Sequence, residues 1–161
     1  MSLFHVISVA VPLTFLLVLP RVLKKYTQNE KQYRLLLYVA CALFFISWYL
    51  PSPLIDGQDT SFVTHFVGGG MFTGFLWLYV RYSLQLKLRW FMDAAILFAL
   101  VSALGSINEL FELFLVQAHL ARILITDTSW DILANTLGAL LVFILHSIFS
   151  ILNSNPHDRR H

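Results

Sequence analysis

The sequence predicts an all-α polytopic membrane protein, a bundle of about five transmembrane helices. Of its 161 residues, 58% are hydrophobic and only 12% are charged, and the mean hydropathy is +0.71. Soluble domains usually carry about 25% charged residues, and a chain of this length cannot hide so much apolar surface in its own interior. The excess is therefore expected to face lipid, which makes 1–161 a single transmembrane domain.

Polar loops divide the chain into five apolar segments close to the roughly 20 residues that cross a bilayer. The first is followed by Pro20 and Arg21, whereas a signal peptide has its basic residues before the apolar core, so we expect a retained helix. Pro51 and Pro53 end the second segment. No alternating pattern predicts β-structure. The predicted helices span 3–20, 35–50, 62–82, 90–117 and 129–153.

The last three predicted helices carry most of the polar and small residues. The third begins near His65, and Gly70 and Gly74 form a small-xxx-small pair that allows another backbone to approach closely. The fourth has Asp93 in its first turn, where a carboxylate interacts favourably with the helix dipole. The fifth contains His146 near its inner end, which we expect to be a hydrogen-bonded or interfacial histidine.

The distribution of basic residues predicts the orientation. Cytoplasmic loops of membrane proteins are enriched in lysine and arginine. With five spans, only Arg122 of the 11 basic residues falls on the opposite side from the rest. The N-terminus is therefore predicted outside and the C-terminus in the cytoplasm. The residues on the cytoplasmic side are Arg21, Lys24, Lys25, Lys31, Arg34, Arg81, Lys87, Arg89, Arg159 and Arg160.

Charge and cysteine content limit the partners. A net charge of +2 does not suggest nucleic-acid binding, so the lipid bilayer is the expected partner. The single cysteine, Cys41, rules out an internal disulfide and a thiolate metal cluster. The oligomeric state is left open by the sequence.

Several ionisable and amide side chains interrupt the apolar segments. A charged side chain at mid-bilayer costs at least roughly 2.5 kcal/mol and usually faces the bundle interior or a water-filled cavity. Glu109 and Glu112 are i,i+3 neighbours, and Asp131 and Asn135 are i,i+4 neighbours, so each pair shares a helix face. With His65, all are predicted within roughly 12 Å of the outer boundary. We therefore expect one pocket that opens to the outer side.

Three kinds of chemistry suit this group, because two close carboxylates in a low dielectric disfavour simultaneous ionisation. Glu109, Glu112 and His65 could perform acid–base catalysis. The same three residues with Asp131 could bind a divalent cation, although the sequence requires no cofactor. Alternatively, the group could be a structural hydrogen-bond network.

Three stretches of the chain resemble the VanZ-like membrane proteins of bacteria: DTSFVTHF at 59–66, NELFELF at 108–114 and DTSWDILANTLGALLVF at 127–143. The doubled glutamate and the three consecutive glycines are more similar to a neighbouring family of uncharacterised bacterial inner-membrane proteins. Thr60 stands where the VanZ-like pattern usually has lysine, and Arg122 loosely matches an arginine of the last outer loop. The matching positions are Asp59, His65-Phe66, Glu109 or Glu112, and Asp131-Asn135-Gly138.

The resemblance implies a multi-pass protein of the bacterial cytoplasmic membrane, in a family named for a factor that lowers sensitivity to the glycopeptide teicoplanin. The expected function is binding or modification of an amphiphile (a lipid, a lipid-linked envelope precursor or a glycopeptide) at the outer face. The expected substrate-binding residues are Asp131, Asn135, Arg122 and Asp59. Two alternatives remain. One is an assembly protein whose polar residues serve packing only. The other is a proton-coupled transporter, although transport needs polar access from both sides and few polar residues occupy the inner halves of the helices. Whether the protein is an enzyme is left open.

Overall fold

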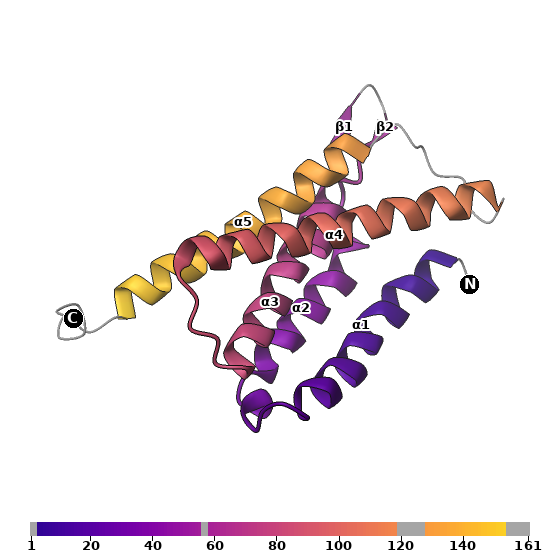
Figure 1. Cartoon of the computed structure of the whole chain (residues 1–161). Helices are drawn as coiled ribbons and strands as arrows, with labels where there is room; N and C mark the ends of the chain where they lie inside the picture. Colours follow the sequence, from indigo (N-terminus) through magenta and orange to yellow (C-terminus); the bar gives the residue numbers. More distant parts are fainter. Residues whose placement is uncertain (1–2, 56–57, 119–127, 154–161) are drawn as a thin grey trace.

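The structure is a computed structural model that describes residues 3–55, 58–118 and 128–153. Its described part confirms the predicted all-α architecture of five helices (Figure 1). A π-helix, η2, runs without a break into α3, and a short 3₁₀ helix, η1, lies between α1 and α2. The helices are α1 Leu3–Leu23, η1 Asn29–Lys31, α2 Arg34–Ser47, η2 Thr64–Met71, α3 Phe72–Ser83, α4 Trp90–Gln117 and α5 Thr128–Asn153.

Among the described helices, three are long and apolar enough to cross a membrane: Val6–Leu23, Trp90–Gln117 and Thr128–Leu152. Helix α2 is apolar but has only 14 residues, because it ends at Ser47 rather than at the predicted position 50. Residues 64–83 form one helical segment whose first part is the π-helix. The chain is thus a membrane protein, and crossing by α2 and by η2–α3 stays a prediction.

In the first half of the chain, consecutive helices pack against each other, whereas in the second half the main contact is between helices that are not consecutive. Helices α1, α2 and α3 lie side by side, and α4 crosses over them in the view of Figure 1. Helix α5 packs mainly against η2. One apolar core lies between α1, α2 and α3 around Leu37 and Tyr79, and a second lies between α3, α4 and α5 around Trp77 and Leu97.

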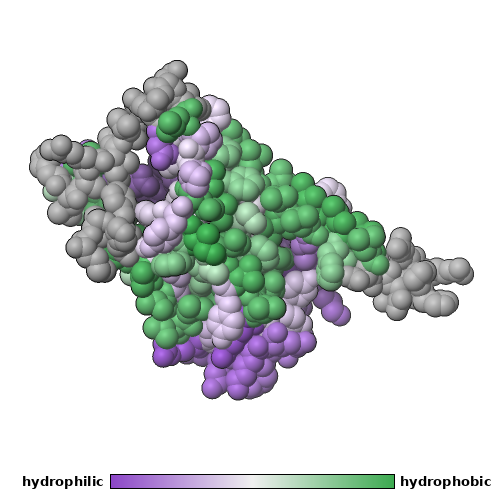
Figure 2. All heavy atoms as spheres, turned by 180° about the vertical axis from the view of Figure 1, so that it is seen from behind, coloured by the Kyte–Doolittle hydropathy of each residue, from purple (hydrophilic) through white to green (hydrophobic). Residues whose placement is uncertain are grey.

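The outer surface of the helices is apolar, as expected for a lipid-facing protein. Large side chains such as Leu17, Phe98 and Leu145 are 54%, 60% and 55% exposed. Figure 2 shows hydrophobic residues over most of one face, with hydrophilic residues gathered at one end. We call this the basic end, because residues 21–34 and 81–89 carry most of the positive charge. The opposite end is the hairpin end.

The hairpin end takes its name from a short antiparallel pair, β1 Leu54–Ile55 and β2 Gln58–Asp59 (Figure 1). The sequence predicted only a loop here, whereas the structure has two strands of two residues each. They pair in the register Leu54↔Asp59 and Ile55↔Gln58. The Thr60 hydroxyl donates to the carbonyl of Pro53 at 2.9 Å and closes the pair. This connection brings the chain back to the start of η2.

Two glycines allow η2 to lie directly against α5. A Cβ atom added to Gly70 would clash with the backbone carbonyl of Asn135 and would lie 2.8 Å from the Cα of Gly138. A Cβ atom added to Gly138 would clash with the carbonyl of Phe66. A Cβ atom at Gly74 would meet the side chain of Val142 instead. The predicted close backbone approach is therefore confirmed at Gly70, with α5 as its partner. This contact fixes the position of Asp131 and Asn135 relative to His65.

Candidate functional site

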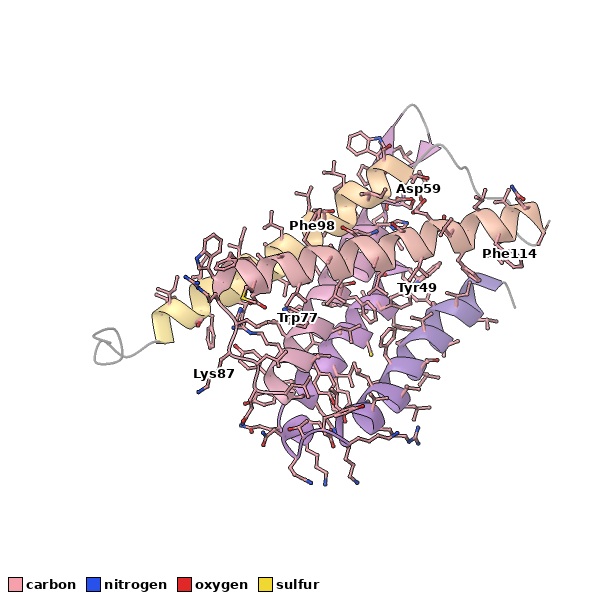
Figure 3. The ribbon with its side chains drawn as sticks, in the orientation of Figure 1. Tyr49, Asp59, Trp77, Lys87, Phe98 and Phe114 are labelled. Carbon is pink, nitrogen blue, oxygen red and sulfur yellow. The ribbon has the colours of Figure 1, made fainter. Side chains whose placement is uncertain are left out.

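At the hairpin end, η2, α4 and α5 bring the predicted site residues together. One ligand atom each of His65, Glu109 and Glu112 lies within 4.8 Å of the other two. We call these three residues the histidine–glutamate set. The two glutamates share a face of α4, as their i,i+3 spacing predicted, and the histidine comes from the first turn of η2. Figure 3 labels Asp59 beside this end of the molecule and Lys87 at the other.

The histidine is presented by a π-helix rather than by the α-helix that the sequence predicted. A π-helix is wider than an α-helix and occurs frequently at functional sites. Here the N–H of Phe72 bonds to the carbonyl of Val67, five residues earlier, at the end of the π segment. The run Gly68–Gly70 inside it was the available signal, which sequence reasoning interpreted only as helix packing.

Asp131 is a direct partner of His65. The distance between His65 Nε2 and Asp131 Oδ1 is 3.3 Å, and the Asp131 residue is 3% exposed. The hydroxyl of Ser61 donates to the same oxygen at 3.3 Å. Ser61 adopts a left-handed conformation (φ 48°), which is uncommon outside glycine, and its N–H donates to Asp59 Oδ1 at 2.9 Å. Asp59 therefore holds the residue that touches Asp131, and does not itself join the histidine–glutamate set.

The two glutamates differ in their partners. Asn108 donates to Glu112 Oε1 at 2.7 Å, an i,i+4 contact along α4. The Oε1 atom of Glu109 is buried and accepts no hydrogen bond from any described residue. No lysine or arginine in the described segments forms an ion pair with Glu109 either. Its carboxylate is therefore held beside another carboxylate and a histidine without a compensating charge from these segments.

Asn135 lies between η2 and α4, where glycines leave room for it. Its side chain occupies the space that a Cβ atom would take at Gly69, and its Nδ2 would lie 3.3 Å from a Cβ atom at Gly105. The residue is only 4% exposed, and its Oδ1 accepts no hydrogen bond within the described residues. A buried amide oxygen without a donor is costly, by roughly 1–3 kcal/mol.

A cavity of about 270 Å³ connects this polar region with an apolar one. His65, Glu112 and Asn135 lie on its polar side, whereas Glu109 is not part of the lining. Helices α1, α2 and α4 contribute the apolar walls. These include Ile7, Val11, Phe15, Phe44, Trp48, Leu104, Ile107, Phe111 and Leu115.

The predicted site residues can now be compared with their positions. His65, Glu109, Glu112, Asp131 and Asn135 converge at the hairpin end, although their catalytic and binding roles stay predictions. Asp131, predicted as a fourth metal ligand, lies outside the histidine–glutamate set, because its carboxylate contacts His65 and Ser61 instead. Arg122 lies outside the described residues.

A second polar group, at the basic end, was missed by sequence reasoning. Asp93, predicted to interact with the helix dipole, is 3% exposed and accepts hydrogen bonds from Trp77 Nε1 and Arg81 Nη1, both at 2.6 Å. The local sequence carries no signal for this contact, because its partners are 16 and 12 residues away on another helix. His146 Nε2 lies 2.5 Å from the Tyr82 hydroxyl, which confirms a hydrogen-bonded histidine.

Glu30 forms a third buried contact, also at the basic end. It is 1% exposed and accepts two hydrogen bonds from the Arg34 guanidinium, both at 2.9 Å. The hydrogen bonds from Arg34 hold the pKa of Glu30 below its ordinary value, against the opposing effect of burial. The i,i+4 spacing of the two residues was a usable sequence signal.

Comparison with models of known protein families, with curated proteins and with solved structures gives no match for this chain. The resemblance to the VanZ-like proteins therefore stays a prediction.

Proposed function

We propose that this protein binds an amphiphile, a lipid or lipid-linked molecule, with its headgroup at the histidine–glutamate set. The observation that carries the proposal is the continuity of the cavity from polar to apolar residues. One side offers His65, Glu112 and Asn135, and the other is lined by aliphatic and aromatic side chains of α1, α2 and α4. A ligand with both a polar and an apolar part fits such a site better than a wholly polar solute.

The same geometry supports acid–base chemistry on the bound headgroup. The Asp131 carboxylate can hold the His65 ring in one tautomer through Nε2, as acidic partners do in many catalytic sites. Glu109 and Glu112 then supply carboxylates within reach of the imidazole. In this proposal His65, Glu109 and Glu112 are the catalytic residues. Asn135 and Asp131, with Asp59 and Arg122, belong to the substrate-binding region.

The proposed location is the outer face of a bacterial cytoplasmic membrane, in a protein of VanZ-like type. The support is the bias of basic residues toward one end, together with the resemblance of residues 59–66, 108–114 and 127–143. Cysteines introduced at Gln58 and Gln28 should then react with an impermeant reagent from opposite sides of the membrane. Labelling of both positions from the outside would contradict the orientation.

Filling the cavity tests the binding proposal directly. Val11 lines the cavity, whereas Val9 on the same helix is 42% exposed and faces away from it, so Val9→Trp is a matched control for Val11→Trp. We expect native mass spectrometry of the detergent-purified protein to show a bound lipid in wild type and in Val9→Trp, and little in Val11→Trp. Equal retention in all three proteins would show that lipid binds elsewhere on the surface.

A further inference from the structure

We infer that His65, Glu109 and Glu112 form a binding site for one divalent transition-metal ion. Three ligand atoms from two different helical segments already lie within 4.8 Å of one another. Zinc, for example, binds nitrogen and oxygen at about 2.0–2.2 Å in tetrahedral geometry, so three ligands on one ion lie roughly 3.3–3.6 Å apart. The distances between the ligand atoms would have to shorten by about 1 Å to complete the site. Rotation of the glutamate side chains can bring this about.

Buried acceptors beside the set are the second observation that points to a bound cation. Asn135 is 4% exposed and lines the same cavity as His65 and Glu112, yet its Oδ1 accepts no hydrogen bond from the described residues. The buried Oε1 of Glu109 likewise accepts no hydrogen bond from the described residues. A metal ion with its bound water would offer a partner to both atoms. The carboxylate of Glu109 would ligate the ion, and a metal-bound water could donate to the amide oxygen.

Asp131 completes the arrangement that metal sites commonly use for histidine. A ligating imidazole usually donates its other ring N–H to a carboxylate, which fixes the tautomer and raises the basicity of the ligand nitrogen. Asp131 Oδ1 lies 3.3 Å from Nε2 of His65. A hydrogen bond from Nε2–H to this oxygen would leave the lone pair of Nδ1 for a metal. Asp131 is then a positioning residue, and Ser61 supports it from the hairpin side.

The donor types select the kind of ion. Carboxylates suit Mg²⁺, Ca²⁺ and Mn²⁺, whereas imidazole suits Zn²⁺ and other first-row metals. One imidazole with two carboxylates therefore favours Mn²⁺ or Zn²⁺ over Mg²⁺ and Ca²⁺. Three protein ligands leave at least one position open, as in catalytic metal sites. In the cavity, that position is available to an oxygen atom of a headgroup.

A metal ion also changes which headgroup the site accepts. Two glutamates alone would repel an anionic phosphate group, whereas a divalent cation between them attracts it and orients it as a Lewis acid. The class of ligand is then an amphiphile with a phosphate headgroup. This role of the metal rests on the proposed function, whereas the binding of the metal does not.

The metal itself is the first probe, used on the full chain in lipid-free detergent. We expect wild type to bind one equivalent of Mn²⁺ or Zn²⁺, measured by competition with a chromophoric chelator. Mg²⁺ should bind much more weakly. Glu109→Gln and Glu112→Gln, which keep the shape of the side chain, should each lower the affinity at least roughly 100-fold, and Asp131→Asn roughly 10–100-fold. Glu30→Gln removes a carboxylate at the basic end and should leave the affinity unchanged.

A spectroscopic measurement separates ligation by His65 from a general loss of structure. In pulsed electron paramagnetic resonance of bound Mn²⁺, the spin echo should be modulated by the nitrogen of one imidazole ligand. His65→Gln should abolish that modulation. No saturable binding of either metal, or binding that survives all the ligand substitutions, would overturn the inference. Equally tight binding of Mg²⁺ would overturn the assigned ligand set.

Lipid retention, measured with and without metal, separates the role of the metal from the proposed function. We expect dimyristoyl phosphatidic acid to be retained in the presence of Mn²⁺ and lost after chelation, whereas dimyristoyl glycerol should bind weakly under both conditions. Retention of lipid without any metal would leave the proposed function standing and refute the role of the metal in lipid binding. Metal binding without retention of either lipid would leave the metal site standing and refute the proposed function.

Discussion

Asp93 at the basic end and Glu109 at the hairpin end are both acidic residues of α4, yet their surroundings differ. Asp93 has Arg81 and Trp77 at 2.6 Å each, so its charge and its lone pairs are satisfied within the protein. Glu109 has a buried oxygen without a donor and lies beside a second carboxylate. A buried carboxylate that is fully paired stabilises the native packing. A buried carboxylate that the described residues leave unpaired indicates a binding site for a ligand or an ion.

The largest expected effect comes from neutralising the paired carboxylate. Asp93→Asn keeps the shape of the side chain but leaves Arg81 without its counter-ion, and breaking a buried ion pair costs about 3 kcal/mol. For a chain of this size, that loss lowers Tm by roughly 6–12 °C. Thermal unfolding in detergent measures it.

Glu109→Gln is the matched substitution at the other end and gives the comparison its sharpest test. In metal-free protein it removes no ion pair and relieves repulsion between two carboxylates, so Tm should stay within about 2 °C of wild type. Glu109→Ala should lose more, because it leaves a hole and an unpaired partner. If Glu109→Gln destabilised the protein as much as Asp93→Asn, the hairpin end would be a structural network and the site hypothesis should be dropped.

A second prediction concerns the backbone contact that holds the site together. Gly70→Ala places a methyl group against the backbone of α5 and should cost about 2 kcal/mol, or roughly 4–8 °C in Tm. Gly105→Ala is the control, since among the described residues its Cβ position would be close only to the side-chain Nδ2 of Asn135, at 3.3 Å. We expect it to be close to neutral, because alanine also gains helix propensity. Equal losses for both would show that η2 and α5 are not in tight contact.

A third prediction uses the pH dependence of the Glu30–Arg34 pair. The pKa of Glu30 is lowered in the folded protein, so its stabilising contribution is present above the unfolded value of about 4.5 and is lost as pH falls through the folded pKa. Glu30→Gln should therefore lower Tm by roughly 3–5 °C at pH 7. The difference from wild type should begin to shrink as pH falls below about 4.5 and should disappear only below the lowered pKa of folded Glu30. A difference that stays constant down to pH 3 would mean that the charge of Glu30 contributes nothing.

A smaller loss of stability than at Glu30 is expected at the Tyr82–His146 contact. Tyr82→Phe removes one hydrogen bond between uncharged partners and keeps the ring that packs against the histidine, so the loss should be about 1 kcal/mol, or roughly 2–4 °C. Metal binding at the hairpin end should not change, because the substitution lies at the basic end. A loss of metal affinity in this variant would show that the two ends are coupled.

The sequence alone determined what depends on local hydropathy and helical spacing. Helix α4 has the predicted bounds of 90–117, and α5 begins one residue before the predicted position 129, because long apolar runs and their polar ends are local properties. The placement of Glu109 and Glu112 on one face followed from the helix period for the same reason.

The tertiary structure decided which distant groups meet and how the backbone adapts to bring them together. The Arg81–Asp93 pair and the His65–Asp131 contact join residues on different helices, and no periodicity encodes such a pairing. The π-helix of η2 also lies where Gly70 and Gly138 bring η2 against α5, a contact between segments far apart in the sequence. Local spacing pairs Glu30 with Arg34, whereas the packing of helices determines which buried charges on different helices find partners.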